Sequence, residues 1–175
     1  MRLPGAIRQL VRERAGFACE YCGVREQDSA AELTVDHFRP RSQGGDDALG
    51  NLVYSCHFCN THKADYWPAS PEELPLWNPR DGPSSDHFLS LEDGRLFPIS
   101  AVGAFSIDRL NLNRPVLIEY RLAQRRIADQ DRTTTAALEV LAALRVLKED
   151  LRDVVREQRE LLQELRHWLE QRHRD

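Results

Sequence analysis

The sequence has few lysines and no long apolar run, and both absences limit what the chain can be. Of its 24 basic residues only Lys63 and Lys148 are lysine, and the formal net charge is −4. A uniformly basic protein that coats nucleic acid is therefore excluded, although a local basic site is not. Because no apolar run approaches 18 residues, the sequence predicts no transmembrane helix.

The N-terminal stretch also lacks the pattern of a secretory leader. Charged residues interrupt its only apolar segment, so we predict no signal peptide and a cytoplasmic protein. Apolar residues make up 41% of the 175 positions and charged residues 30%. Such a chain can bury a core, which excludes wholesale disorder.

Composition divides the chain into three predicted domains. Residues 1–66 contain all four cysteines. Residues 67–114 are rich in Pro, Gly, Ser and Asp and are expected to form loops and short strands, with a hairpin turn at residues 92–94. Residues 115–175 contain no glycine and a single proline, Pro115, and are expected to form helices.

Within residues 1–66 the local pattern predicts a compact α+β unit. A first helix is expected to begin after Pro4 and to end near Gly16. Residues 33–38 have the β-branched and aromatic character of a strand, and a second short apolar run covers residues 51–56. A helix is then expected near Cys59.

The four cysteines form two pairs with the same spacing, Cys19-x-x-Cys22 and Cys56-x-x-Cys59. A two-residue gap lets one tight turn present two sulfurs, and tetrahedral Zn²⁺ takes four such ligands at about 2.3 Å. A redox dithiol is the alternative interpretation. Four thiolates would leave the zinc centre with a negative charge, so we expect it to be structural.

The segment between the cysteine pairs contains a candidate catalytic site. A hard cation such as Mg²⁺ takes oxygen ligands, which the Asp36 carboxylate and the Asn60 side-chain carbonyl offer. His37 is the candidate general base, since imidazole titrates near neutral pH. Adjacent residues of a regular strand point to opposite faces, so Asp36 and His37 converge only if the strand ends or distorts there.

Other polar residues near this segment have competing interpretations. His62 lies about 200° around a helix from Asn60, so only one of the two can face a metal, and we favour Asn60. Arg39, Arg41 and Lys63 are the candidate phosphate contacts. The alternative is a salt bridge from the arginines to Asp46 or Asp47 and a solvated ammonium at Lys63.

Four motifs in this order, CEYCG, LTVDHFRPRSQGG, NLV and CHFCNTHK, resemble an HNH endonuclease of the zinc-stapled, ββα-metal type. The resemblance covers about residues 16–66. It implies that Asp36 and Asn60 bind a catalytic divalent metal, Mg²⁺ or another, and that His37 is the general base. It also implies that Asn51 fixes the backbone that orients His37.

A looser resemblance extends past this module, to LWNPRDGPSSDHF and SIDRLNLNRP, which are similar to the extension of many bacterial HNH proteins. This looser resemblance implies no catalytic role. The resemblance of residues 16–66 implies metal-dependent hydrolysis of DNA phosphodiester bonds. The alternative is a non-catalytic adaptor in which the same zinc-stabilised module binds nucleic acid or protein.

The last segment has a heptad pattern. It predicts a long helix that packs on residues 115–131 as an antiparallel hairpin, or that forms a coiled-coil homodimer or binds a partner protein. The three threonines at 133–135 are the expected helix N-cap, and Gln158 is the one polar position in the seam. The seam consists of Val140, Leu144, Leu147, Leu151, Val154, Gln158, Leu161, Leu165 and Trp168.

Overall fold

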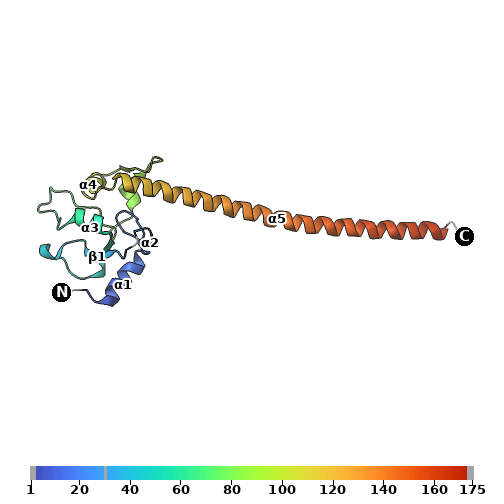
Figure 1. Ribbon diagram of the computed structural model, residues 1–175, viewed down its shortest axis with the longest axis horizontal. Coiled ribbons are helices and arrows are strands. Elements are labelled where there is room, and N and C mark those ends of the chain that lie inside the picture. The colour runs from blue at the N-terminus through green and yellow to red at the C-terminus, as the bar shows by residue number, and fades with distance from the viewer. Residues whose placement is uncertain (1–2, 30, 173–175) are drawn as a thin grey trace. The chain divides into compact units, whose positions relative to one another are not determined.

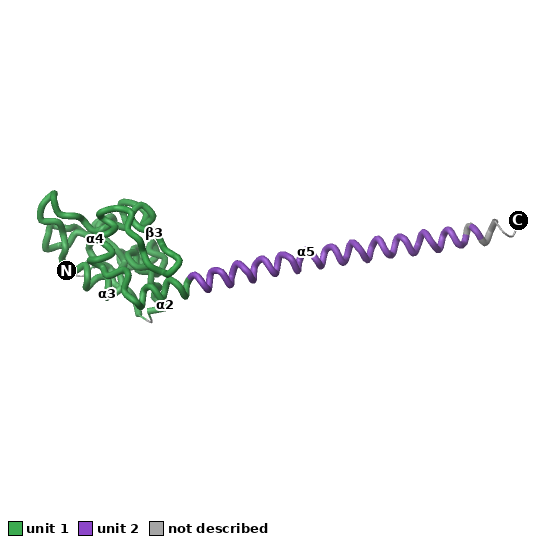
Figure 2. Tube along the Cα trace, turned by 90° about the horizontal axis from the view of Figure 1, so that it is seen from above, with its two compact units in different colours: residues 1–124 green, residues 125–175 purple. Residues whose placement is uncertain are grey.

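The computed structural model describes residues 3–29 and 31–172. The chain divides into two compact units, residues 1–124 and residues 125–175 (Figure 2). The first unit mixes short helices with two small sheets, and the second is part of one long helix. The helices and strands are α1 (Gly5–Arg14), α2 (Glu26–Ser29), β1 (Thr34–His37), β2 (Leu52–Ser55), α3 (His57–Lys63), β3 (Phe88–Ser90), β4 (Leu96–Pro98), α4 (Ala101–Arg109) and α5 (Pro115–Arg172) (Figure 1).

The elements predicted in the first 66 residues are confirmed. Helix α1 follows Pro4 and buries Val11 completely. Strands β1 and β2 pair antiparallel, with Asp36 opposite Val53 and His37 opposite Leu52. Helix α3 begins after Cys56, whose sulfur accepts the Cys59 N–H at 3.4 Å. Two strands and a helix thus follow one another around the cysteine pairs, which makes this an α+β module.

The segment after residue 66 is more ordered than its composition predicted. The hairpin is confirmed, since β3 and β4 pair antiparallel around Gly94, which has a φ of +83°. Residues 101–109, however, form a helix where loops and short strands were expected. The Ser100 hydroxyl caps this helix by accepting the Gly103 N–H at 2.9 Å, which supplies the start signal that composition does not show.

Both parts of the first unit contribute to one hydrophobic core. Leu52 and Val53 of β2 belong to it, and so do Trp77, Phe88 and Leu110 from the later segment. Residues on both sides of the expected boundary at residue 66 therefore pack into the same core.

The C-terminal segment forms one helix where several were predicted. Helix α5 runs without a break from Pro115 to Arg172, so a hairpin in which it packs on residues 115–131 is excluded. The predicted cap at the three threonines is also wrong. Their hydroxyls donate to the carbonyl four residues earlier, each at 2.9 Å, a bond that lets threonine remain within a helix.

The first turns of α5 are fixed to the first unit. Leu117 is buried in the core, and the Tyr120 hydroxyl donates to Asp28 Oδ2 at 2.7 Å. Arg121 donates to the Gly94 carbonyl at 2.8 Å. Within residues 3–29 and 31–172, none of the helices combines the length and apolarity that crossing a membrane requires.

Candidate functional site

The four cysteines meet at one buried point. Their sulfurs all lie within 4.8 Å of one another, and Cys22 Sγ lies 3.8 Å from Cys56 Sγ. That separation is far longer than a disulfide bond. It matches the edge of a tetrahedron of sulfurs about 2.3 Å from a central ion. The donor set therefore fits zinc.

Hydrogen bonds among the four sulfurs lower the pKa values of Cys22 and Cys56 and raise those of Cys19 and Cys59. The first turn is fixed by the Gly23 N–H, which donates to the Cys19 carbonyl at 2.8 Å. Metal binding requires thiolates, so an ion bound here would displace the protons that the sulfurs hold.

Asp36 points from β1 toward α3, where two side chains meet its carboxylate. Lys63 Nζ lies 2.8 Å from Asp36 Oδ2, and the Lys63 side chain is only 1% exposed. The amide end of Asn60 faces the same carboxylate at 3.0 and 3.3 Å. Sequence spacing placed Asn60 and Lys63 on one turn of helix, and tertiary packing brings that turn to Asp36.

The Asn60 amide can face Asp36 in two ways. With its nitrogen turned to the carboxylate it donates to both oxygens, at 3.3 Å to Oδ1 and 3.0 Å to Oδ2. With its oxygen turned there, three oxygen atoms converge, which is the donor set that Mg²⁺ or Mn²⁺ takes alongside water. The residues present therefore fit a hard divalent cation.

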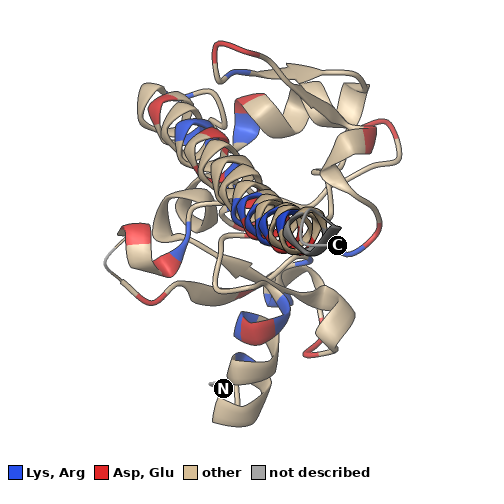
Figure 3. Ribbon diagram, turned by 90° about the vertical axis from the view of Figure 1, so that its right-hand side faces the viewer, with Lys and Arg blue, Asp and Glu red and all other residues tan. Residues whose placement is uncertain are grey.

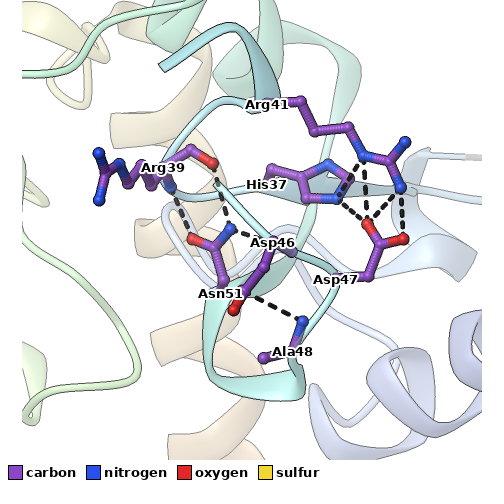
Figure 4. A network of polar contacts seen from close by, with 7 residues as sticks. All are labelled: His37, Arg39, Arg41, Asp46, Asp47, Ala48 and Asn51. Atoms are coloured by element: carbon purple, nitrogen blue, oxygen red, sulfur yellow. Dashed lines mark hydrogen bonds and ion pairs between the residues drawn. The ribbon is translucent and has the colours of Figure 1, made fainter. Parts of the chain in front are cut away.

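His37 is the last residue of β1, and its side chain faces a different set of partners (Figure 4). Its Nε2 lies 2.7 Å from Asp47 Oδ1 and 3.3 Å from Arg41 Nε. Arg41 also forms an ion pair with Asp47. Because β1 is regular up to His37, the side chains of Asp36 and His37 leave opposite faces of the strand and contact different groups.

Arg41 and His37 keep Asp47 ionised. Hydrogen bonds from Arg41, and secondarily from His37, hold the pKa of Asp47 below its usual value. Asp47 and Arg41 both contact His37 Nε2 and together fix the plane of the ring. The salt bridge from Arg41 to Asp47 was one of the predicted alternatives, whereas the contact from Asp47 to His37 was not predicted. The nine intervening residues gave no periodic signal for it.

Asn51 holds the loop that follows His37 (Figure 4). Its amide oxygen accepts the Arg39 N–H at 2.8 Å, and its nitrogen donates to the carbonyls of Arg39 at 3.1 Å and Asp46 at 2.8 Å. A Cβ at Gly45 would lie 1.8 Å from the Arg39 carbonyl oxygen, so only glycine allows this approach. The arrangement ties both ends of the loop to the end of β1.

The segment after residue 66 supports this loop from outside. The Arg39 guanidinium lies over the Trp67 ring, 5.1 Å from its centroid, and Trp67 meets Phe38 edge-on at 6.0 Å. Arg109 donates to the Lys63 carbonyl at 3.2 Å. Contacts from residues 67–114 therefore reach both the residues that follow β1 and the end of α3.

A cluster of buried ion pairs around Glu20 joins the first cysteine turn to residues 67–114. Glu20 lies between the first two cysteines, and its side chain is 6% exposed. It forms ion pairs with Arg14 of α1 and with Arg80, and it accepts the Tyr54 N–H at 2.6 Å. Because Glu20 follows Cys19 and its side chain accepts the N–H of Tyr54 in β2, these contacts hold the first cysteine turn against β2.

Two histidines near the site make other contacts. The His62 ring stacks on Phe58 with centroids 4.0 Å apart, and its Nδ1 lies 2.9 Å from the Phe58 carbonyl oxygen. His57 is exposed at the start of α3. The structure thus brings Asn60, rather than His62, to Asp36.

Lys63 is not the solvated ammonium that was the alternative to a phosphate contact. Its ammonium is covered and paired with Asp36, while Arg39 and Arg41 remain on the outer loop. A phosphate contact at Lys63 stays a prediction, and it would require the ammonium to leave Asp36.

A cavity of about 480 Å³ borders His37 on the side of α1. Its wall combines the apolar face of β1 with basic side chains of α1, including Arg8 and Arg12. Arg12 is already paired with Glu26 at 2.7 Å, so this wall has little net positive charge to offer.

Comparison with known families agrees with this geometry. The family model described as HNH endonuclease matches residues 19–65. Those residues are an HNH domain. The match begins at the first cysteine and ends just after α3, so it contains the cysteine cluster, Asp36, His37, Asn51 and Asn60. No curated protein and no solved structure matches the chain.

Proposed function

We propose that this protein is a metal-dependent endonuclease that hydrolyses DNA phosphodiester bonds. The observation that carries the proposal is the meeting of Asp36 and Asn60 within 3.0–3.3 Å. His37, the next residue of β1, leaves the opposite face of the strand. The HNH domain supports a nuclease of this kind.

Asp36 and Asn60 would hold the divalent metal, Mg²⁺ or a similar ion. When bound, such an ion supplies Lewis-acid stabilisation of the developing phosphate charge and the leaving oxygen. The two residues come from β1 and α3, so the fold itself sets their separation.

His37 acts as the general base that takes a proton from the attacking water. Asn51 holds the backbone that follows His37, and Asp47 fixes its ring. Arg41 pairs with Asp47 in this structure, so a DNA phosphate that binds Arg41 must replace that carboxylate or share the guanidinium with it. Arg39 extends the same basic edge.

The cysteine cluster is proposed to hold a structural zinc ion. Four thiolates give the centre a negative charge, which repels phosphate, so the zinc site and the phosphate site have separate roles. The zinc links the first cysteine turn to the start of α3 and thereby positions Asn60 relative to β1.

A non-catalytic adaptor is the rival function, and a plasmid-cleavage assay separates the two. We expect supercoiled DNA to be nicked or linearised with Mg²⁺ or Mn²⁺, and to remain intact with EDTA. An adaptor would bind the DNA without cutting it under any of these conditions. Intact DNA with every divalent metal tested, from protein that is folded and contains zinc, would contradict the proposed nuclease.

Lys63 is proposed to limit the metal affinity of this site. An ammonium 2.8 Å from Asp36 repels an incoming cation, and unit charges about 4 Å apart interact by about 4 kcal/mol at an effective dielectric constant of 20. Lys63→Met should therefore increase the affinity for Mn²⁺ by about tenfold or more. Isothermal titration calorimetry on zinc-loaded protein measures this directly.

The control for that experiment is the only other lysine. Lys148 is exposed on α5, and Lys148→Met should leave Mn²⁺ affinity unchanged. If Lys63→Met keeps its zinc and binds Mn²⁺ no more tightly than the wild type, the ammonium does not compete with the metal.

A further inference from the structure

Helix α5 has a long apolar stripe that lies open to solvent. From Val140 to Leu169, apolar side chains recur at three positions of each seven, interrupted by Lys148 and Gln158, and those that the structure describes are 38–62% exposed. The Trp168 side chain lies outside the described side chains. Contiguous exposed apolar surface of this length marks an interaction site. The stripe consists of Val140, Leu141, Leu144, Leu147, Leu151, Val154, Val155, Leu161, Leu162, Leu165 and Leu169.

The heptad positions show how the stripe is arranged around the helix. The seam residues occupy positions a and d, and the additional apolar residues occupy position e. At 3.5 residues per turn, d and e lie about 50° to either side of a. The stripe is therefore centred on position a, and positions b and g border it on opposite sides, each about 100° away.

These two borders have opposite charge. Position b is arginine in four successive heptads, at 145, 152, 159 and 166, whereas position g is acidic at 150, 157 and 164. Figure 3 shows both signs of charge along α5. We call the first set the arginine row and the second the acidic row. Further charges pair within the helix, as Arg156 does with Asp153 at 2.8 Å.

A stripe bordered in this way is complementary to a second copy of itself in one orientation. When parallel helices pack around a common axis, opposite borders meet, so the arginine row of one faces the acidic row of the next. When two copies pack antiparallel, like borders meet, and arginine faces arginine. In register, Asp150, Glu157 and Glu164 lie near the levels of Arg152, Arg159 and Arg166 of the other copy.

Gln158 favours the same orientation. It is the polar residue among the a positions of the stripe, and a parallel pair in register places it opposite its own copy, where the two amides can bond to each other. An antiparallel pair with the whole stripe overlapped would place Gln158 near the level of Leu151, and the amide would lose its partner.

We propose that α5 binds α5 of another copy of this chain, parallel and in register, through the stripe with its arginine and acidic rows. The proposed partner is a second copy of the chain, because the arginine row of one copy is complementary in charge to the acidic row of another. Three apolar positions per heptad also allow more than two copies. Parallel packing joins the HNH domains to the same end of the assembly, so that two candidate active sites serve one DNA molecule.

The matched variant exchanges the rows and keeps the composition. It combines Asp150→Arg with Arg152→Asp, Glu157→Arg with Arg159→Glu, and Glu164→Arg with Arg166→Glu. The full-length wild type and the row-exchanged chain should each assemble when expressed alone, as light scattering at tens of micromolar measures. Circular dichroism checks that both remain helical.

Co-expression of the two chains with different tags tests the orientation. Parallel packing places arginine against arginine in mixed assemblies, so they should form less often than random mixing predicts. Antiparallel packing would make mixed assemblies the preferred product, and that result would overturn the proposal. A wild-type chain that is monomeric at tens of micromolar would overturn it as well, and the stripe would then belong to a different partner.

Discussion

Replacing His37 with alanine is expected to lower the rate of DNA cleavage by about 10²–10⁴-fold, the contribution typical of a general base. His37 ends β1, and the nearest charged groups at its Nε2 are Asp47 and Arg41. An ionised carboxylate and a guanidinium cannot replace imidazole as a base near neutral pH. Single-turnover cleavage of a labelled duplex with saturating Mg²⁺ measures the chemical step.

His62→Ala is the matched control, because His62 lies one helix turn after Phe58 and contacts that residue instead of Asp36. Its cleavage rate should equal that of the wild type. DNA binding by His37→Ala, measured in EDTA, should be nearly unchanged. A His37→Ala protein that cuts at the wild-type rate would exclude the proposed mechanism. Loss of cleavage in His62→Ala alone would indicate that His62 binds the metal in place of Asn60.

Loss of one cysteine of the cluster is expected to remove most of the stability of the first unit. Zinc binding in small zinc domains contributes about 10–16 kcal/mol, which is comparable with the total stability of an ordinary domain, about 5–15 kcal/mol. Cys22→Ser or Cys56→Ser should therefore lower the melting temperature strongly and reduce bound zinc below about one ion per chain. Elemental analysis and near-ultraviolet circular dichroism measure the two effects.

Metal exchange provides the control for this prediction. Wild-type protein stripped by a strong chelator should recover its near-ultraviolet signal when Zn²⁺ is added, but not when Mg²⁺ is added, because a hard cation does not replace zinc among thiolates. Protein that contains no zinc yet melts at an unchanged temperature would contradict a structural zinc ion.

Much of the first unit follows from local sequence because its signals lie close together. The cysteine spacing predicted a four-sulfur cluster, and the structure places all four sulfurs within 4.8 Å. The strand around Asp36 and the helix around Asn60 were readable from residue type and turn signals. The heptad pattern likewise predicted a helix in the last segment.

Other features depended on packing between distant parts of the chain. The sequence suggested a solvated Lys63 or a phosphate contact, whereas the fold buries its ammonium against Asp36. The contact between Asp47 and His37 spans a loop whose path depends on Asn51 and Gly45. Such pairs are fixed by burial and by long-range contacts, which have no period in the sequence.

In the C-terminal segment, the features that the sequence determined and those that the tertiary structure decided are easiest to tell apart. Periodicity determined that residues after 140 form an amphipathic helix and which of its positions are apolar. It could not decide between a hairpin and a single helix, because the heptad pattern after residue 140 is the same in both. The structure decided this point: one helix continues from Pro115 to Arg172, and the three threonines bond within it instead of starting a second helix. An uninterrupted helix cannot cover its own stripe, so those apolar side chains stay exposed.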